Sequence, residues 1–201
     1  MGLQNKMKFK DYQDTIVIDL NKQQAMNKKV RWSYNKALKN NIVLKKTELH
    51  ELKEIHELIV AHGEENNYKS YSMDRLLNSL DSDLMFTALF EGMIIGVLIL
   101  SDNDDGLKVD TCVCNKRYKN LEVYTFLWVK AIEIAKWMNK SSIDLGGIYV
   151  DAKPSTKYYN ITRFKERLGG EVVRKELYFN NLIYVIGRKM VRFCKRNGLM
   201  K

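Results

Sequence analysis

The polar groups best suited to chemistry lie in residues 142–173, which read SIDLGGIYVDAKPSTKYYNITRFKERLGGEVV. Asp144 ends a short apolar run and stands just before Gly146 and Gly147. A carboxylate at this point could orient an amine or accept its proton, which acylation of an amine requires. The competing interpretation is structural, because Asp close to glycine commonly accepts the backbone N–H groups of the following turn. The two glycines permit a sharp turn or the close approach of a ligand.

Lys165 is the candidate cation of the same stretch. It stands with Phe164 one turn before Gly169 and Gly170, a pattern typical of a helix C-terminus with glycine in the left-handed position. An ordinary lysine at this position would be exposed on the helix and paired with a neighbouring glutamate.

These residues need a mixed architecture to position them. Strands are predicted over residues 15–20, 42–46, 84–90, 93–100, 107–114, 142–145, 171–179 and 182–186, and helices over residues 21–40, 47–62, 73–80, 118–139 and 156–168, followed by a basic terminal helix. Glu91-Gly92 is typical of a tight hairpin turn. The order predicts an α/β (α+β) fold in which helices flank a mixed, mostly antiparallel sheet.

Length and charge limit the possibilities further. A chain of 201 residues can bury one good core and is a little short for two, so a single domain over residues 1–201 is expected. Residues 1–46 hold 11 Lys/Arg against 3 Asp/Glu, residues 47–111 hold 4 against 14, and residues 112–201 hold 19 against 7. If the two basic ends meet, they form a positive surface suited to phosphates of CoA, a nucleotide-sugar, tRNA or a membrane. The alternative is a soluble basic surface with no such partner.

Several protein classes lose support. No apolar stretch reaches the ~20 residues of a membrane span and no signal-peptide core is present, so a cytoplasmic protein is expected. Cys112, Cys114 and Cys194 lack metal-site or disulfide spacing. The three histidines recur every six residues of one predicted helix and face different directions, so no metal site is expected. Sequence signatures of hydrolases, P-loop NTPases and metalloproteases are also missing.

The 142–173 block is accompanied by a basic run near the N-terminus. Residues 28–32 read KKVRW and are followed by Asn35-Lys36-Ala37 and by NNIV at residues 40–43. Together these segments resemble the FemABX branch of the GNAT acyltransferase superfamily over most of the chain. The resemblance implies a GNAT core over residues 42–186, a FemABX-like basic lead-in over residues 1–41, and a basic C-terminal helix over residues 187–201.

The resemblance also assigns site residues. In FemABX-like sequences the Phe-Lys pair lies near the reacting centre, so Lys165 could stabilise charge on the acyl oxygen, with Asp144 as second catalytic candidate. The acceptor-binding candidates are Arg31, Lys36, Gly146, Gly147 and Tyr149. Four tyrosines are candidate general acids, namely Tyr118, Tyr149, Tyr158 and Tyr159.

Two segments contain the candidate residues for binding the acyl donor. The resemblance implies a splayed strand near residues 109–114, whose backbone at Thr111 and Val113 would polarise the donor carbonyl. Acyl-CoA-using relatives hold pyrophosphate on a glycine-rich turn before the long helix. Residues 115–123 read NKRYKNLEV without glycine, which disfavours a close cradle but leaves three side chains that could hold phosphate, those of Lys116, Arg117 and Lys119.

The function implied is N-acyl transfer by direct attack, from acyl-CoA (acetyl-CoA) or aminoacyl-tRNA to an amine of a cell-envelope or surface-polysaccharide precursor. No metal is expected. The expected partners are a small-molecule or lipid-linked amine, tRNA, a peripheral membrane surface and a second copy of the chain. Two alternatives stay open: a non-catalytic GNAT-like module that binds nucleic acid, and a half-domain that works only as an oligomer or beside a second chain.

Overall fold

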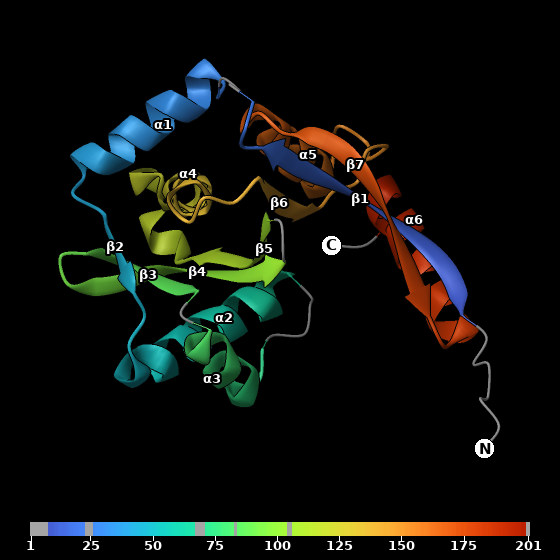
Figure 1. The fold of residues 1–201 in the computed structure, drawn as a ribbon, viewed down its shortest axis with the longest axis horizontal. Coiled ribbons are helices and arrows are strands. Elements are labelled where there is room, and N and C mark those ends of the chain that lie inside the picture. Colours follow the sequence, from blue (N-terminus) through green and yellow to red (C-terminus); the bar gives the residue numbers. More distant parts are fainter. Residues whose placement is uncertain (1–7, 23–25, 67–70, 83, 104–105, 200–201) are drawn as a thin grey trace. The chain divides into compact units, whose positions relative to one another are not determined.

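The computed structural model describes residues 8–22, 26–66, 71–82, 84–103 and 106–199 (Figure 1). The chain forms two compact units, a larger one of residues 18–144 and a smaller one of residues 1–17 and 145–201. The division passes through two strands, β1 (Phe9–Asp19) and β6 (Ser142–Gly147).

The described residues of the larger unit form five strands and four α-helices. Its elements are α1 (Lys28–Lys39), β2 (Val43–Lys46), the 3-10 turn η1 (Leu49–Glu51), α2 (Leu52–Asn66), α3 (Met73–Asp81), β3 (Met85–Phe90), β4 (Met93–Asn103), β5 (Gly106–Cys114), the 3-10 turn η2 (Lys116–Leu121), α4 (Val123–Trp137) and the first half of β6. The strands run in the order β2-β3-β4-β5-β6, antiparallel except between β5 and β6. Helices α1 and α4 cover one face of β2–β5 and α2 and α3 cover the other (Figure 1).

The core on the α2 side explains why these segments form these elements. Leu52, Ile55 and Ile59 recur at helical spacing, and all three are almost fully buried. They join a cluster drawn from α3 and three strands, whose other members are Leu76, Met85, Val97, Ile99 and Val113. Each large aliphatic side chain buried in this way contributes about 1.5–3 kcal/mol relative to exposure. The turn between β3 and β4 has positive φ at both Glu91 and Gly92, which confirms the predicted tight hairpin.

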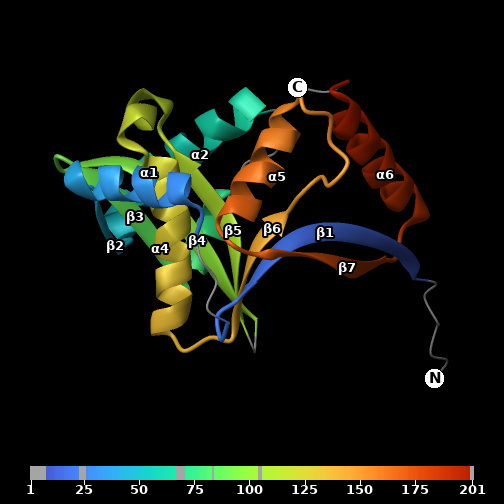
Figure 2. The same cartoon turned by 90° about the horizontal axis from the view of Figure 1, so that it is seen from above.

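The smaller unit is built on a two-stranded ribbon. Strand β1 pairs antiparallel with β7 (Glu171–Phe179), from Phe9↔Phe179 to Val17↔Glu171, and the strand order is β6-β1-β7. Helices α5 (Lys157–Arg167) and α6 (Leu182–Asn197) lie on the same side of the ribbon (Figure 2). Thr156 caps α5 by accepting the Tyr159 N–H at 3.2 Å, which confirms the predicted start of this helix.

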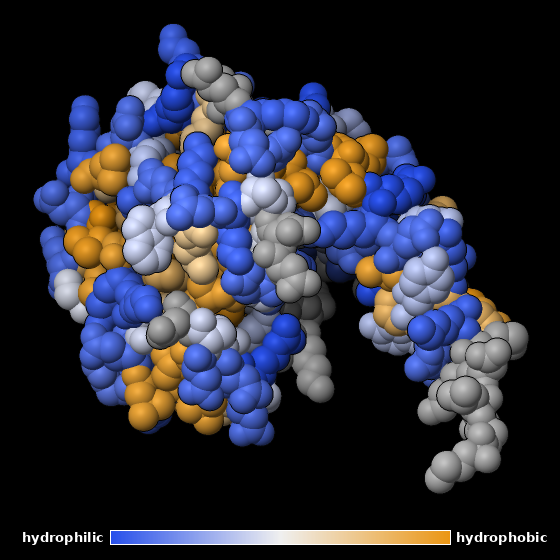
Figure 3. All heavy atoms as spheres, in the orientation of Figure 1, coloured by the Kyte–Doolittle hydropathy of each residue, from blue (hydrophilic) through white to orange (hydrophobic). Residues whose placement is uncertain are grey.

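The C-terminal region differs most from the prediction. Residues 182–186, predicted as a strand, form the first turns of α6, which Asn181 caps by accepting the Tyr184 N–H at 3.2 Å. The apolar, β-branched run suggested a strand, but helical spacing lets Arg188, Arg192 and Arg196 all face the carboxylates of β1. The opposite face of α6 is apolar and exposed, and hydrophobic side chains reach the surface at this end of the unit (Figure 3).

Three predicted helix starts were also wrong. Helix α1 begins at Lys28 behind Asn27, whose side chain accepts the Lys29 N–H at 2.9 Å; the prediction began at residue 21, and residues 23–25 lie outside the described parts. The helix predicted from residue 47 instead has Glu48 as its N-cap, in a reciprocal cap with Glu51. The helix predicted over residues 118–139 is interrupted, because Glu122 has φ +63° between η2 and α4.

Candidate active site

Lys165 is held inside the smaller unit. It lies on α5 with 7% of its surface exposed, and its Nζ donates to the Gly147 carbonyl oxygen at 3.1 Å. Glu166, the partner expected of an exposed lysine, instead accepts from Arg163 at 2.8 Å. Lys165 is therefore not an ordinary surface lysine, and its ammonium group is fixed beside the loop that follows β6.

Helix α5 is tied to that loop by a threonine. Thr162 Oγ1 accepts the Tyr149 N–H at 3.2 Å and donates to the Tyr158 carbonyl oxygen at 2.9 Å. The rings of Tyr149 and Tyr158 meet edge to face with centroids 4.9 Å apart. These contacts bring three of the predicted site residues, Lys165, Gly147 and Tyr149, into one region.

Two different constraints favour glycine at the end of β6, a backbone conformation at Gly146 and a close side-chain contact at Gly147. Gly146 has φ +79°, a conformation that strains any residue with a Cβ. At Gly147 an added Cβ would lie 2.2 Å from Gln13 Nε2, the movable end of a long side chain. We therefore expect Gly146 to tolerate substitution less well than Gly147.

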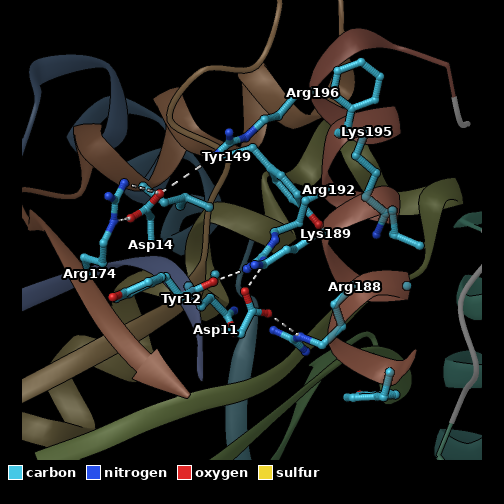
Figure 4. A pocket seen from close by; sticks show the side chains of 17 residues that line it. Asp11, Tyr12, Asp14, Tyr149, Arg174, Arg188, Lys189, Arg192, Lys195 and Arg196 are labelled. Carbon is cyan, nitrogen blue, oxygen red and sulfur yellow. Dashed lines mark hydrogen bonds and ion pairs between the residues drawn. The ribbon is translucent and has the colours of Figure 1, made fainter. Parts of the chain in front are cut away.

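A cavity of about 870 Å³ opens beside this region (Figure 4). Gly147 and Tyr149 line it together with residues of β1, β7 and α6. The charged lining residues are Asp11, Asp14, Arg174, Arg188, Lys189, Arg192, Lys195 and Arg196. None of these eight was a predicted site residue, because the arginines were assigned only to a basic terminal helix and their partners on β1 lie far away in the sequence.

Two buried aspartates hold the arginines in place. Asp11 is 1% exposed and accepts from Arg188 Nε at 3.1 Å and from Arg192 Nη2. Asp14 accepts from Arg174 Nε at 2.8 Å. Burial favours the protonated form of Asp11, but hydrogen bonds from Arg192, the Tyr12 backbone and Arg188 outweigh it, so the pKa of Asp11 lies below its ordinary value.

In the larger unit, β5 offers an incompletely paired edge. Strands β5 and β6 pair over Gly106↔Ser142, Leu107↔Ile143 and Lys108↔Asp144. Among the described residues of this unit, the part of β5 that follows, residues 109–114, pairs with β4 only. A backbone edge of this kind can donate hydrogen bonds to a carbonyl. Asp144 is 6% exposed at the last of the three pairs.

The two residues whose backbone was predicted to polarise a donor carbonyl, Thr111 and Val113, both lie on β5. Thr111 pairs with Ile99, and Val113 pairs with Val97. The Val113 side chain is 2% exposed and belongs to the core against α2, so only its backbone is available to a donor. Cys112 and Cys114 lie on the same strand, and burial raises the pKa of Cys114 above its ordinary value.

The turn between β5 and α4 uses its polar groups internally. The Asn115 side chain accepts the Arg117 N–H at 3.0 Å, and the Lys119 carbonyl accepts the Glu122 N–H at 3.2 Å. Lys116 Nζ lies 2.6 Å from Glu65. The cavity beside Lys116 and Arg117 is also lined by Glu54, Glu57 and Glu65. This turn therefore has fewer donors and more carboxylates than a phosphate site needs.

The two predicted acceptor-binding cations of α1, Arg31 and Lys36, have different surroundings. Arg31 is exposed, whereas Lys36 Nζ lies 3.7 Å from the Glu122 carboxylate and 5.4 Å from the Trp32 ring centroid. Lys36 thus neutralises a carboxylate at the start of α4. Lys119 is exposed. Among the described residues no group of three His, Cys, Asp or Glu could hold a metal ion, and no helix there is long and apolar enough to cross a membrane.

Neither a family model nor a curated protein matches the sequence. Solved structures do. FemX superposes with a TM-score of 0.70 at 11% identity, over 89% of this chain and 64% of its own. The C-terminal domain of a putative lysylphosphatidylglycerol synthetase from Agrobacterium fabrum gives 0.67 at 12% identity, over 93% of this chain and 66% of its own. A GCN5-related glucosamine N-acetyltransferase region of a fungal β-N-acetylglucosaminidase gives 0.59 at 11% identity, over 84% and 20%.

The chain has a GNAT fold of the FemX-like type. It spans about two thirds of the FemX and synthetase chains. The GNAT fold agrees with the mixed, mostly antiparallel sheet expected from the sequence.

Proposed function

We propose that this protein is an N-acyltransferase that moves an acyl or aminoacyl group to an amine of a cell-envelope or surface-polysaccharide precursor. The observation that carries the proposal is the buried ammonium group of Lys165, fixed 3.1 Å from the Gly147 carbonyl oxygen. Support for the reaction class comes from two structurally similar proteins, a putative lysylphosphatidylglycerol synthetase and a glucosamine N-acetyltransferase region.

The chemistry needs few side chains. The neutral acceptor amine attacks the donor carbonyl carbon, a C–N bond forms, and the ester or thioester bond to the leaving group breaks. Lys165 stabilises the negative charge that develops on the carbonyl oxygen. A base takes the proton that the amine loses. The proton ends on the leaving oxygen or sulfur. The amine then carries the acyl group as an amide.

Of the two donors, the geometry favours an aminoacyl ester over acyl-CoA. A pyrophosphate cradle needs unpaired N–H groups and little negative charge. In the turn of residues 115–122, the amides of Arg117, Tyr118 and Glu122 bond within the turn, and Glu65 neutralises Lys116. Aminoacyl-tRNA does not need this turn, because its phosphates would bind other parts of the basic surface. tRNA is therefore the expected partner.

We therefore expect acetyl-CoA to bind no more tightly than ADP in calorimetry at moderate salt. ADP serves as the control for charge attraction, and desulfo-CoA as the control for the thioester. Glu65→Gln, which frees Lys116, is expected to increase acetyl-CoA affinity only slightly. Micromolar binding of acetyl-CoA by the unmodified protein, clearly tighter than ADP, would contradict the ester donor and identify a CoA-dependent enzyme.

Transfer itself is tested with tRNA charged with radiolabelled amino acids and a panel of amine acceptors. The panel contains glucosamine, a nucleotide-linked amino sugar and a lysine-containing peptide. The expected result is a labelled amide that survives mild base, whereas the ester of the donor hydrolyses. Failure of every donor and acceptor to give a labelled amide, with acetyl-CoA included in the panel, would argue against acyl transfer.

A further inference from the structure

The α6 cavity of the smaller unit carries more positive charge than its carboxylates neutralise. Six cationic side chains line it, against the two carboxylates of Asp11 and Asp14. Three of the cations come from one face of α6, at Arg188, Arg192 and Arg196, and the close-up shows them in a row opposite β1 (Figure 4). Cations gathered in a concave surface repel one another unless an anion enters.

Asp11 and Asp14 hold the arginines of α6 with different strength. Asp11 takes hydrogen bonds from both Arg188 and Arg192, so those two guanidinium groups are structural. Arg196 is held more loosely, since its Nη2 lies 3.9 Å from Asp14 and its Nη1 lies 3.5 Å from Asp151. Its Nε is buried and finds no acceptor among the described residues. A buried guanidinium donor without an acceptor is costly and favours an anionic ligand.

Two lysines of the cavity, Lys189 and Lys195, also lack a carboxylate partner in the described parts of the chain. Lys189 lines the cavity and makes no ion pair with any carboxylate of the described residues. Lys195 lies over the rings of Tyr149 and Tyr158, 5.8 and 5.3 Å from their centroids, also without a carboxylate partner there. Arg196, Lys189 and Lys195 are thus three cations with incomplete neutralisation in one cavity.

We propose that this cavity binds a diphosphate group through Arg196, Lys189 and Lys195. A carboxylate would neutralise only one of the three cations, whereas a diphosphate carries several negative charges and enough oxygens to accept from all of them. The cavity volume of about 870 Å³ leaves room for further parts of the ligand. The ring of Tyr149, which lines the cavity, offers an apolar surface beside the cations.

The position connects the diphosphate to the reacting region, a step that rests on the proposed function. Gly147 lines the cavity, and its carbonyl oxygen accepts from Lys165. A ligand held by its diphosphate would extend along Tyr149 toward this loop. The diphosphate would therefore belong to the acceptor, linked either to a nucleotide or to a lipid.

The test is calorimetric titration of the full chain with inorganic pyrophosphate at moderate salt. Saturable binding is expected, and Lys189→Gln, Lys195→Gln and Arg196→Gln should each weaken it by about tenfold or more, the usual effect of losing one charged hydrogen bond. Lys153→Gln removes the same charge from an exposed position of this unit outside the cavity, so it should leave binding unchanged. Thermal unfolding checks that each variant is folded.

Absence of saturable pyrophosphate binding, or an equal loss in Lys153→Gln, would overturn the proposal. UDP-N-acetylglucosamine and vesicles with undecaprenyl diphosphate distinguish the two sources, since only the correct one should bind more tightly than pyrophosphate. If neither does, the site is not part of the acceptor site. Because these measurements need no donor and no turnover, they can succeed where the transfer assay fails, and the two proposals fail separately.

Discussion

Lys165→Met is expected to lower kcat/KM for acyl transfer by about 10²–10³-fold, the effect of removing one preorganised donor to a developing oxyanion. The structural reason is that the ammonium group is already buried and fixed on the Gly147 carbonyl oxygen, so it pays no reorganisation cost when charge develops. Methionine has a similar length but no charge. The loss should appear in kcat, with KM for the acceptor changed little.

Arg167→Met is the matched control for this prediction. Arg167 lies two residues further along α5 but is exposed, so its replacement should leave kcat/KM within about twofold, as expected for a surface change away from the site. A purely structural lysine would give a different pattern. In that case Lys165→Met would lower the melting temperature while the folded fraction kept its full kcat.

Chemical rescue separates the two roles further. Lys165→Ala leaves space for a small cation, so added ethylammonium should restore part of kcat if the ammonium acts on the substrate. Ethanol, which has the same size and no charge, should not. Equal rescue by the two compounds would show that space filling, and not charge, explains the defect.

The part of the site that the sequence could predict depends on local pattern. Phe164-Lys165 before a diglycine placed the lysine on the last turns of a helix, and Thr156 marked where that helix begins, because caps and glycine positions are set by neighbouring residues. The hairpin at Glu91-Gly92 was predictable for the same reason. The burial of Lys165 was not, since it results from packing against the loop at Gly147.

The α6 cavity could not be predicted because its contacts join the two ends of the chain. Asp11 and Arg188 are 177 residues apart, and no local pattern relates them. The one available signal was the spacing of Arg188, Arg192 and Arg196, which fits one helix face. The prediction did place these arginines in a basic terminal helix, but no local pattern showed that their face meets the carboxylates of β1. The break at Glu122 was hidden by apolar periodicity that continued through it.

The same long-range contacts lead to the largest expected effect on stability. Asp11→Asn should reduce the free energy of unfolding by about 3 kcal/mol, within the range for removing one partner of a buried ion pair. Asp11 is 1% exposed and accepts from both Arg188 and Arg192, so the substitution leaves two guanidinium groups facing an amide. Urea unfolding of the full chain measures the difference.

Asp151→Asn provides the control within the same unit. The Asp151 side chain is 72% exposed and lies 3.5 Å from Arg196, so its loss should change stability by less than about 0.5 kcal/mol, as is usual for a surface ion pair. If Asp11→Asn also stayed within that limit, the arginines of α6 would not depend on β1 for their placement, and the framework of the proposed diphosphate site would fail.

The pH dependence follows from the direction of the Asp11 shift. The pKa of Asp11 is lower in the folded protein than in the unfolded chain, so the unfolded state binds a proton first as the pH falls. The contribution of Asp11 is fully present above its unfolded pKa and is lost as the pH falls through the folded value. Wild-type stability should therefore decline more steeply in acid than that of Asp11→Asn, and the two unfolding curves should converge. Parallel curves down to the lowest pH at which the protein stays soluble would mean that the Asp11 carboxylate contributes nothing to stability through its charge, and that the placement of α6 rests on packing alone.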